Sequence, residues 1–366
     1  MSASAPPGTS FQIVCTDPGP RFLGLRASER NRRIARRRGG VDTVNGAPLP
    51  TLVVPAGVVI TPALLDLLPP PVGVWHLLWD RSGVPIVWQA AGSAGRSSAQ
   101  TTELPPGAAF DVSTVQARRQ ASWSLLKASG KPADGWLSRH LHRRISRIFS
   151  YLFLVAGLSP NAATIATFGI GVASAWLMAQ TSHSTMIAAA FLFWCASIAD
   201  GIDGEMARLT FSESRFGEQL DTGVDQLTYA FGLAGVFLGW SRQGIGPPGL
   251  ALAAVVAISI PTLLWWAMRM VRRARNTTQF FVPTKPIEGA VFAAARRLRT
   301  PALRAAAAVF VLFRREAFSL AFFLVSLLTG SRMVYPLLLA AGLGIVTLTF
   351  LLHREELTEA LAQEFA

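Results

Sequence analysis

The chain has 366 residues, of which 51% are hydrophobic and only 15% are charged, and its mean hydropathy is +0.38. Soluble domains are usually about 25% charged, so this composition argues against a purely cytosolic protein. The 34 Lys and Arg residues outnumber the 21 Asp and Glu residues, which gives a net charge of +13 and indicates an anionic partner, either nucleic acid or a membrane surface. The two cysteines, Cys15 and Cys195, are too few for a disulfide framework or a zinc site.

Residues 1–130 are predicted to form a small cytoplasmic α/β domain. Residues 52–60 indicate a buried strand followed by a turn, a helix is expected to begin near Thr61 and Pro62, and residues 83–88 indicate another strand. The first apolar stretch, residues 11–15, is too short for the hydrophobic region of a signal peptide, so we expect this part of the chain to stay in the cytoplasm. The arginine-rich run at residues 30–38 is typical of a solvated or membrane-facing helix.

Residues 131–157 contain a basic amphipathic pattern that predicts a juxtamembrane helix at the cytoplasmic interface. Arginines alternate there with apolar residues at helical spacing: Arg139, Arg143, Arg144 and Arg147 with Trp136, Leu137, Leu141, Ile145 and Ile148. One interpretation is a surface helix that binds lipid headgroups. The other is an anion pocket for a phosphorylated acceptor, because clustered arginines suit a phosphate monoester. The candidates for that pocket are Lys131, Arg143, Arg147, Arg314 and Arg315.

Beyond residue 158 the sequence consists of long apolar runs separated by short breaks. A bilayer core requires about 20 apolar residues per helix, so we expect a mainly α, polytopic membrane domain at residues 158–356, followed by a C-terminal tail at 357–366. The six predicted transmembrane helices cover residues 162–180, 186–202, 216–240, 250–269, 317–328 with a few residues more at each end, and 333–352.

The distribution of arginine predicts the orientation of these helices. Short cytoplasmic loops collect Lys and Arg, and the connection between the fourth and fifth helices is rich in arginine, whereas the alternate loops hold only Arg242 and Arg332. The N-terminal domain and the active site are therefore expected on the cytoplasmic side of a bacterial-type inner membrane. This topology explains much of the basic charge without nucleic acid.

Four aspartates lie where the second and third predicted helices meet. Asp200 and Asp203 are three residues apart and Asp221 and Asp225 are four apart, so each pair shares one helix face. An ionisable group in hydrocarbon costs about 2.5–3.5 kcal/mol on insertion scales. Four converging carboxylates therefore indicate bound cations, and hard oxygen ligands suit Mg²⁺, Mn²⁺ or Ca²⁺.

Small residues accompany the acidic stripe and leave room for a bulky ligand. Gly204 and Ala207 follow Asp200 at helical spacing, Gly217 precedes Asp221 by four residues, and Arg208 is placed to clamp a diphosphate oxygen. Three nearby glutamates are predicted to be solvated loop or helix-end charges: Glu205, Glu213 and Glu218.

The spacing D-x-x-D-G-x-x-A-R-x(8)-G-x(3)-D-x(3)-D resembles the signature of the CDP-alcohol phosphotransferases, also called CDP-alcohol phosphatidyltransferases, at every position. The sequence Leu158-Ser159-Pro160-Asn161 is similar to the S-P-N element that opens their membrane domain. The resemblance covers roughly residue 131 to the C-terminus. It implies a six-helix membrane enzyme, usually a homodimer, that transfers a substituted phosphoryl group from a CDP-alcohol to an acceptor hydroxyl and releases CMP.

The resemblance also implies roles for the motif residues. Two divalent cations, Mg²⁺ or Mn²⁺, would be bound by Asp200, Asp203, Asp221 and Asp225, and Asp225 would also deprotonate the acceptor hydroxyl. The CDP pocket would be lined by Asp200, Asp203, Gly204, Ala207, Arg208, Gly217 and Asp221.

Some members of this family carry a fused nucleotidyltransferase-like domain that makes the CDP-alcohol, and the predicted strand-turn-helix of residues 52–62 is similar to the middle of such a domain. Two features depart from a working nucleotidyltransferase. Residues 17–24, DPGPRFLG, lack a Gly-rich loop of the expected kind, and Gly57 stands where an acidic metal ligand is expected. We therefore expect a degenerate, non-catalytic domain.

The substrates stay open at this point. The donor is CDP-diacylglycerol, which would give a phospholipid, or a soluble CDP-polyol. The acceptor is an alcohol, in particular a polyol phosphate such as inositol phosphate. A divalent-cation transporter is an alternative, although it requires no Gly, Ala and Arg at fixed offsets. A nucleic-acid binder is disfavoured because residues 30–38 lack interleaved aromatics for base stacking.

Overall fold

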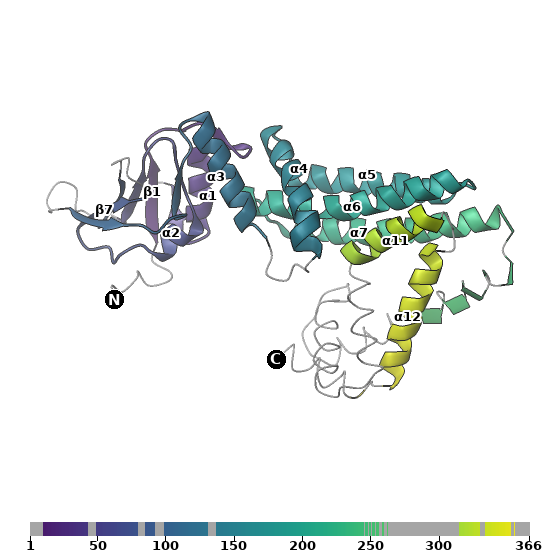
Figure 1. The fold of residues 1–366 in the computed structure, drawn as a ribbon. Coiled ribbons are helices and arrows are strands. Elements are labelled where there is room, and N and C mark those ends of the chain that lie inside the picture. Colours follow the sequence, from purple (N-terminus) through teal and green to yellow (C-terminus); the bar gives the residue numbers. More distant parts are fainter. Residues whose placement is uncertain are drawn as a thin grey trace. The chain divides into compact units, whose positions relative to one another are not determined.

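The computed structural model describes residues 10–42, 49–79, 85–91, 99–130, 137–244, 315–329 and 334–352, together with single positions between 246 and 262 and at 355. Most of this part of the chain is helical, and an α/β region lies at its N-terminal end (Figure 1). The chain divides into two compact units, and the long helix that carries the first two aspartates of the motif passes from one to the other. The first unit comprises Met1–Gly135, Arg143–Thr164 and Gly201–Leu220, and the second comprises Trp136–His142, Ile165–Asp200 and Asp221–Ala366.

A six-stranded mixed sheet forms the centre of the α/β region, with the strand order β4-β1-β5-β8-β7-β9. Strand β1 pairs in parallel with both β4 and β5, and helix α1, Ala27–Arg36, belongs to the crossover between β1 and β4. Strand β8 is antiparallel to both its neighbours. The strands of this sheet are β1 Phe11–Cys15, β4 Gly40–Val41, β5 Thr51–Val54, β7 Val74–Leu78, β8 Ile86–Gln89 and β9 Gln100–Glu103.

Two small antiparallel pairs and two helices complete the α/β region. Strand β2, Arg21–Phe22, pairs with β3, Leu25–Arg26, and β6, Val58–Ile60, pairs with β10, Ala109–Asp111. The helices are α2, Pro62–Asp66, and α3, Val115–Ala128.

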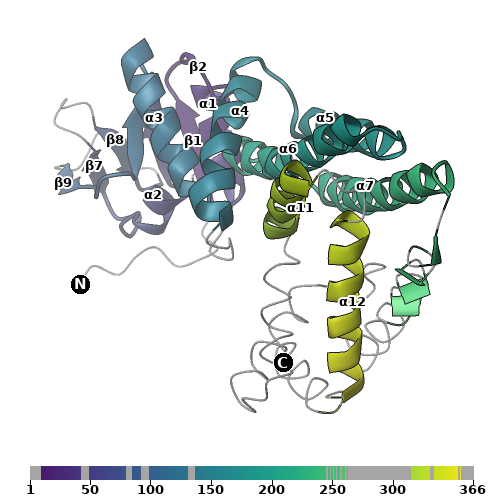
Figure 2. The same cartoon turned by 45° about the vertical axis from the view of Figure 1, so that its right-hand side comes forward.

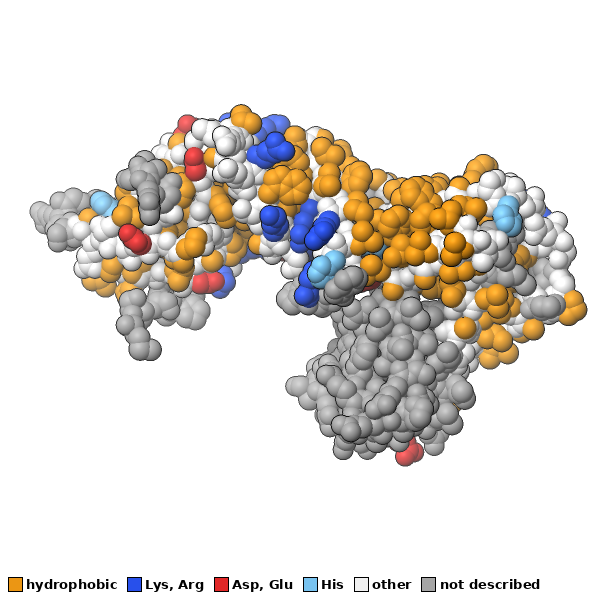
Figure 3. All heavy atoms as spheres, in the orientation of Figure 1, with side chains coloured by type: hydrophobic (Ala, Val, Ile, Leu, Met, Phe, Trp, Pro, Cys, Tyr) orange, Lys and Arg blue, Asp and Glu red, His pale blue; other side chains and the backbone are white. Residues whose placement is uncertain are grey.

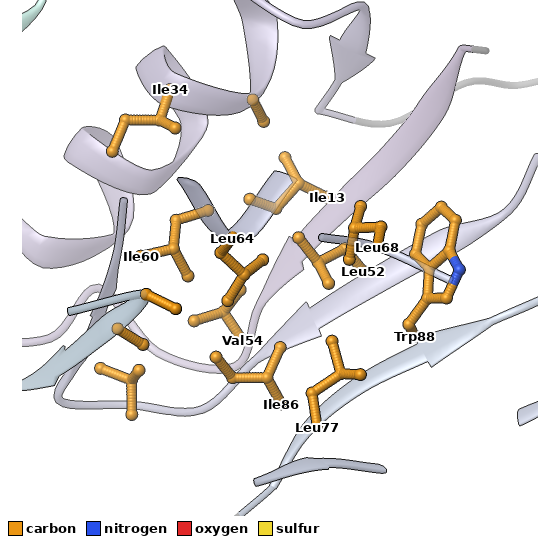
Figure 4. Packing of buried hydrophobic residues seen from close by; sticks show 14 of the residues in the cluster. Ile13, Ile34, Leu52, Val54, Ile60, Leu64, Leu68, Leu77, Ile86 and Trp88 are labelled. Carbon is orange, nitrogen blue, oxygen red and sulfur yellow. The ribbon is translucent and has the colours of Figure 1, made fainter. Parts of the chain in front are cut away.

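The core of this region is apolar and tightly packed. Figure 4 shows side chains from the sheet meeting those of α1 and α2, and Ile13, Leu52 and Trp88 are at most 1% exposed. Trp88 donates its indole N–H to the carbonyl of Pro69 at 3.0 Å, so its one polar group is satisfied inside the core. The buried Asn31 of α1 uses both ends of its amide to hold β6, accepting from the Ile60 amide at 3.0 Å and donating to the Val58 carbonyl at 2.8 Å.

The prediction for residues 52–60 was partly wrong. Strand β5 ends at Val54, Gly57 turns the chain with φ +74°, and β6 then leaves the main sheet to pair with β10. Two strands therefore occupy a stretch that was predicted as one. The predicted helix start is confirmed, because Thr61 is the N-cap of α2 and Pro62 is its first residue. The strand predicted at residues 83–88 corresponds to β8, and its first two residues lie outside the described part of the chain.

The remaining helices follow the predicted runs with shifted ends. A π-helical turn at Ser138–His142 leads into α4, Arg143–Val155. Ser159 caps the helix after it by accepting from the Ala162 amide at 3.2 Å, and Pro160 begins that helix. The other helices are α5 Pro160–Met178, α6 His183–Thr210, α7 Arg215–Ser241, α11 Arg315–Thr329 and α12 Val334–Leu352.

Two differences from the predicted spans concern α6 and the fourth span. Helix α6 continues past residue 202 as far as Thr210, so the whole acidic motif of its second half is helical. Most residues of the span predicted at 250–269 lie outside the described part of the chain.

Within the described part of the chain, α5 and α6 are long and apolar enough to cross a membrane by length and composition. In Figures 1 and 2 these two helices run side by side with α7. Buried residues from α5, α6, α7 and α11 join in one apolar cluster that includes Met178, Phe193, Val236 and Phe322. The surface of α5 and α6 seen in Figure 3 is also largely apolar. Trp176 of α5 is 65% exposed. Apolar residues thus lie both between these helices and on their outer surface.

A glycine lets α5 and α7 approach closely. A Cβ atom at Gly235 of α7 would overlap the carbonyl oxygen of Ala175 on α5 and would lie 3.1 Å from its carbonyl carbon. Backbone cannot move away as a flexible side chain would. Small residues likewise allow the backbones of two transmembrane helices to approach closely.

Replacing Gly235 by Ala should therefore destabilise the helical bundle by about 1–3 kcal/mol, because the added methyl group forces α5 and α7 apart. Thermal unfolding of the purified protein in detergent measures this. Gly169→Ala on α5 is the matched control, since a Cβ atom there meets nothing within 4 Å and Ala favours the helix. Equal melting temperatures for the two variants would contradict the close approach.

Candidate functional site

Three aspartates converge from two helices of the second unit. Asp200 comes from α6, and Asp221 and Asp225 come from successive turns of α7. One carboxylate oxygen from each of the three lies within 4.8 Å of the other two, and all three side chains are half-buried. The structure thus brings together three of the four aspartates that the sequence singled out.

Arg315, at the beginning of α11, supplies the countercharge in this cluster. Its guanidinium pairs with Asp200 at 2.6 Å and also contacts Asp225. It lies 5.7 Å from the ring centroid of Tyr229, which is one turn beyond Asp225 on α7. The sequence placed Arg315 among the phosphate-binding candidates, and the structure places it directly against two of the predicted metal ligands.

The donor set suits a divalent cation. All three groups are carboxylates, the hard oxygen ligands that Mg²⁺ and Mn²⁺ prefer, and their mutual distances bring them within reach of one shared ion. Carboxylates so close together repel one another unless positive charge lies among them. The described residues therefore form an acidic group that can bind metal.

Asp203 lies one helical turn beyond Asp200 on α6 and belongs to the first unit. Its side chain is 9% exposed, and one carboxylate oxygen accepts a hydrogen bond from the Thr164 hydroxyl at 2.6 Å. Thr164 lies in the second turn of α5, so this bond ties α5 to α6. Thr164 was not among the predicted site residues, and its place soon after the S-P-N element was the available signal.

The small residues of the motif lie on the less buried face of α6. Gly204, Ala207 and Arg208 are half-buried, whereas Met206 and Leu209 between and beside them are fully buried. A partly accessible stripe therefore follows the acidic positions along the helix. That this stripe leaves room for a ligand stays a prediction.

Gly217 lies at the beginning of α7, close to the start of α5. Its amide donates to the hydroxyl of Ser214 at 3.0 Å, and a Cβ atom there would lie 3.4 Å from the side-chain oxygen of Asn161. The S-P-N element and the central glycine of the motif are thus neighbours in space.

The guanidinium of Arg208 is held from the α/β region. Its Nε donates to the carbonyl of Ser129 at 3.1 Å, and Ser129 is the C-cap of α3. A residue predicted to bind the diphosphate is thereby oriented by a carbonyl of the N-terminal part of the chain.

The prediction that Glu205 is a solvated charge was wrong. Its side chain is 0% exposed and forms an ion pair with Arg143 at 3.0 Å. The hydroxyls of Ser146 and Ser150 donate to the same carboxylate at 3.2 and 2.7 Å. Helix α4 therefore turns its polar face toward α6, and this network fastens the two helices. The partner lies 62 residues away in sequence, so no local pattern indicated it.

The predicted acceptor-binding residues lie in different places. Arg143 is buried against Glu205 and also donates to the Gly201 carbonyl at 3.3 Å. Arg147, one turn later on α4, donates to the Lys127 carbonyl at 3.4 Å. Arg315 contacts the acidic cluster of the second unit. The other two candidates, Lys131 and Arg314, lie outside the described residues.

Residues 158–331 match the profile of the CDP-alcohol phosphatidyltransferase family, and this range contains the whole acidic motif. The chain therefore carries a CDP-alcohol phosphatidyltransferase domain, as the motif indicated.

Curated relatives agree with this family. The chain is 38% identical over 117 residues to a bifunctional IPC transferase and DIPP synthase of Thermococcus kodakarensis, which covers 32% of this chain and 26% of the relative. It is 28% identical over 125 residues to a phosphatidylinositol phosphate synthase of Mycobacteroides abscessus, covering 34% and 56%. A CDP-diacylglycerol–serine O-phosphatidyltransferase of Helicobacter pylori is 32% identical over 103 residues, covering 28% and 41%. The chain thus spans between a quarter and about half the length of these relatives.

Removing one partner of the buried Arg143–Glu205 pair should cost much stability. Glu205→Ala leaves Arg143 buried without its countercharge, and we expect a loss of about 3–5 kcal/mol in the free energy of unfolding. The double variant Arg143→Met/Glu205→Leu, which removes both charges, should lose less. Denaturant unfolding in detergent measures these differences.

Glu213→Ala is the matched control for this prediction. Glu213 forms an ion pair with Arg37, but its side chain is 46% exposed, so we expect a change of about 1 kcal/mol or less. A Glu205→Ala protein as stable as the Glu213→Ala protein would show that the buried pair does not hold α4 on α6.

Proposed function

We propose that the protein is a metal-dependent CDP-alcohol phosphotransferase. It transfers a substituted phosphoryl group from a CDP-alcohol to the hydroxyl of an alcohol acceptor and releases CMP. The observation that carries the proposal is the convergence of Asp200, Asp221 and Asp225, which occupy the motif positions inside the family domain. A purely structural role does not explain three carboxylates between apolar helices, because each carboxylate there costs free energy.

Two divalent cations, Mg²⁺ or Mn²⁺, are assigned to the aspartates of the motif. Asp200, Asp221 and Asp225 provide the clustered oxygens, and Asp203 adds a fourth carboxylate one turn along α6. Bound there, the cations would neutralise the diphosphate of the donor and stabilise the departing CMP.

Asp225 is assigned the role of general base. The acceptor oxygen forms a bond to the phosphorus that bears the alcohol of the donor, the bond from this phosphorus to the CMP phosphate breaks, and Asp225 takes the hydroxyl proton. Gly204, Ala207, Arg208 and Gly217 are assigned to the CDP moiety. Their place along a partly accessible stripe of α6 and at the start of α7 supports this.

Arg315 is suited to bind a phosphate of the acceptor, because a guanidinium at the edge of the acidic cluster can pair with a phosphate dianion. We retain Lys131, Arg143, Arg147 and Arg314 as further acceptor candidates. Among the candidates that the structure describes, Arg143 is the least suited to bind the acceptor, because it is buried against Glu205.

We infer CDP-diacylglycerol or a similar lipid as the donor and a polyol phosphate, such as inositol phosphate, as the acceptor, which places the reaction in phospholipid biosynthesis. The names of the relatives from Mycobacteroides abscessus and Helicobacter pylori support this choice. The second candidate is the synthesis of a soluble phosphodiester from a CDP-polyol, which the bifunctional relatives favour.

The membrane arrangement that we propose has six transmembrane helices in residues 158–356, with α5 and α6 as its first two. Helix α4, in the segment 131–157, lies at the interface. Three of its four buried residues are polar, while Ile148, Phe149, Leu152 and Val155 are exposed and suit contact with lipid. Residues 1–130 and the active site are assigned to the cytoplasmic side of a bacterial-type inner membrane, residues 357–366 form a tail, and the enzyme is a homodimer.

The variants Asp221→Asn and Asp225→Asn test the function. Each should reduce CMP release from CDP-diacylglycerol with inositol phosphate and Mg²⁺ by about 10³-fold or more, because an amide neither replaces the carboxylate ligand nor accepts the proton. Mn²⁺ binding by the same proteins reports the loss of a ligand separately. Glu218→Gln, on the same helix, is the matched control.

CMP release without dependence on a divalent cation would contradict the metal-dependent mechanism. A protein that releases no CMP with any donor but conducts Mn²⁺ into vesicles, with the flux retained in Asp221→Asn, would instead support a transporter.

The N-terminal domain is proposed to be a degenerate nucleotidyltransferase-like domain. Gly57 occupies the position where an acidic metal ligand is expected, and its φ of +74° and the nearby Ser113 leave no unstrained place for a side chain. The full chain given labelled CTP and a polyol phosphate should therefore release no pyrophosphate. Formation of a CDP-alcohol in that assay would contradict this expectation.

A further inference from the structure

Helix α6 ends in a conformation that normally requires glycine. Phe211, the residue after the helix, has φ +53°, and the amide of Ser212 donates to the carbonyl of Ala207 at 3.0 Å. This is the pattern in which a left-handed residue closes a helix, and a side chain there costs free energy unless other contacts compensate. Contacts to the α/β region surround Phe211.

Two arginines of α1 complete the end of α6. Arg30 donates to the carbonyl of Leu209, and Arg33 donates to the carbonyl of Thr210 at 3.0 Å. The last carbonyls of a helix have no partner inside it, and positive charge is favourable at this end of the helix dipole. Arg30 is 2% exposed. Burial lowers the pKa of Arg30 to about 9, so the guanidinium remains charged at neutral pH.

The ring of Phe211 is held by the same helix. The guanidinium carbons of Arg30 and Arg37 lie 5.0 and 5.2 Å from its centroid, within the range of cation–π contacts. Arg30 also lies 5.6 Å from the ring of Phe22, and Phe211 packs against the core of the α/β region. The residue in the strained conformation is therefore held by two arginines of α1 and by the core of the α/β region.

We propose that the N-terminal domain positions the donor-binding residues of the transferase site, with Arg30 and Arg33 as positioning residues that act through the end of α6. Gly204, Ala207 and Arg208 lie in the last two turns of this helix, and α3 orients Arg208 through the Ser129 carbonyl. The inference rests on the proposed function, because it assigns these residues to the donor. It gives a domain without the expected nucleotidyltransferase residues a role in the same reaction.

The first measurement does not depend on activity. Hydrogen exchange of residues 205–213 in the full chain, in detergent, should be faster in Arg30→Met than in the unaltered protein, because the Leu209 carbonyl loses its partner and Phe211 loses one of its two cation–π contacts. Arg33→Met keeps the buried Arg30 and should show a smaller increase, so it serves as the second variant if Arg30→Met folds poorly.

The second measurement is kinetic. Arg30→Met should raise the KM for the CDP-alcohol about tenfold and leave kcat nearly unchanged, since the residues displaced bind the donor and Asp225 on α7 is not affected. Arg30→Lys, which retains the charge and a donor, should recover part of the loss.

Arg36→Gln is the matched control on α1. Arg36 pairs with Asp42 at the surface, and its removal should change neither the exchange of residues 205–213 nor the KM. Unchanged exchange and unchanged donor KM in both Arg30→Met and Arg33→Met would overturn the proposal. If the unaltered protein releases no CMP with any donor, the proposed function fails, whereas the exchange measurement still decides whether α1 holds the end of α6.

Discussion

Electrostatic repulsion within the acidic cluster is the constraint that the helical part of this protein must satisfy. At 4.8 Å, two unit charges repel by about 3.5 kcal/mol even at an effective dielectric of 20. Three carboxylates held at that range from α6 and α7 need both a rigid support and positive charge among them. Arg315 provides such a charge from α11. The close approach of α5 and α7 at Gly235 and the apolar cluster around Phe193 and Phe322 provide the support.

Helix α6 contributes to two ionic networks, one through Asp200 and the other through Glu205. One face presents Asp200, Gly204, Ala207 and Arg208, which are half-buried. Glu205, on a neighbouring part of the helix surface, is buried in a network with Arg143 and two serines, where both charges are paired. The first face is partly accessible, and the buried Glu205 network holds α6 against α4.

The convergence of Asp200, Asp221 and Asp225 could be predicted from the sequence because helical periodicity is a local property. Spacings of three and four residues bring aspartates to one face of a helix wherever that helix lies, and this allowed Asp221 and Asp225 to be paired before their surroundings were known. The start of α5 could also be predicted from the local sequence, because Ser159 is its N-cap and Pro160 is its first residue. The amphipathic α4 was recognised as a helix, but its polar residues were expected to face solvent or headgroups.

What could not be predicted depends on distant partners. Glu205 is charged and follows the acidic motif, so a solvated position was reasonable until Arg143, 62 residues away, was found against it. Arg30 and Arg33 donate to backbone carbonyls. Every residue has such a carbonyl, so the residue type does not indicate which one an arginine will bind. Strand β6 was missed because its partner, β10, lies about fifty positions further along the chain.

The left-handed Phe211 has a consequence for the order in which the protein forms. Domains generally fold as units, and the N-terminal one folds first during synthesis. Helix α1 and its arginines leave the ribosome long before residue 211, so a folded α/β domain can receive the phenylalanine ring as soon as α6 is complete. The N-terminal domain would then serve as a template on which the C-terminal end of α6 is completed.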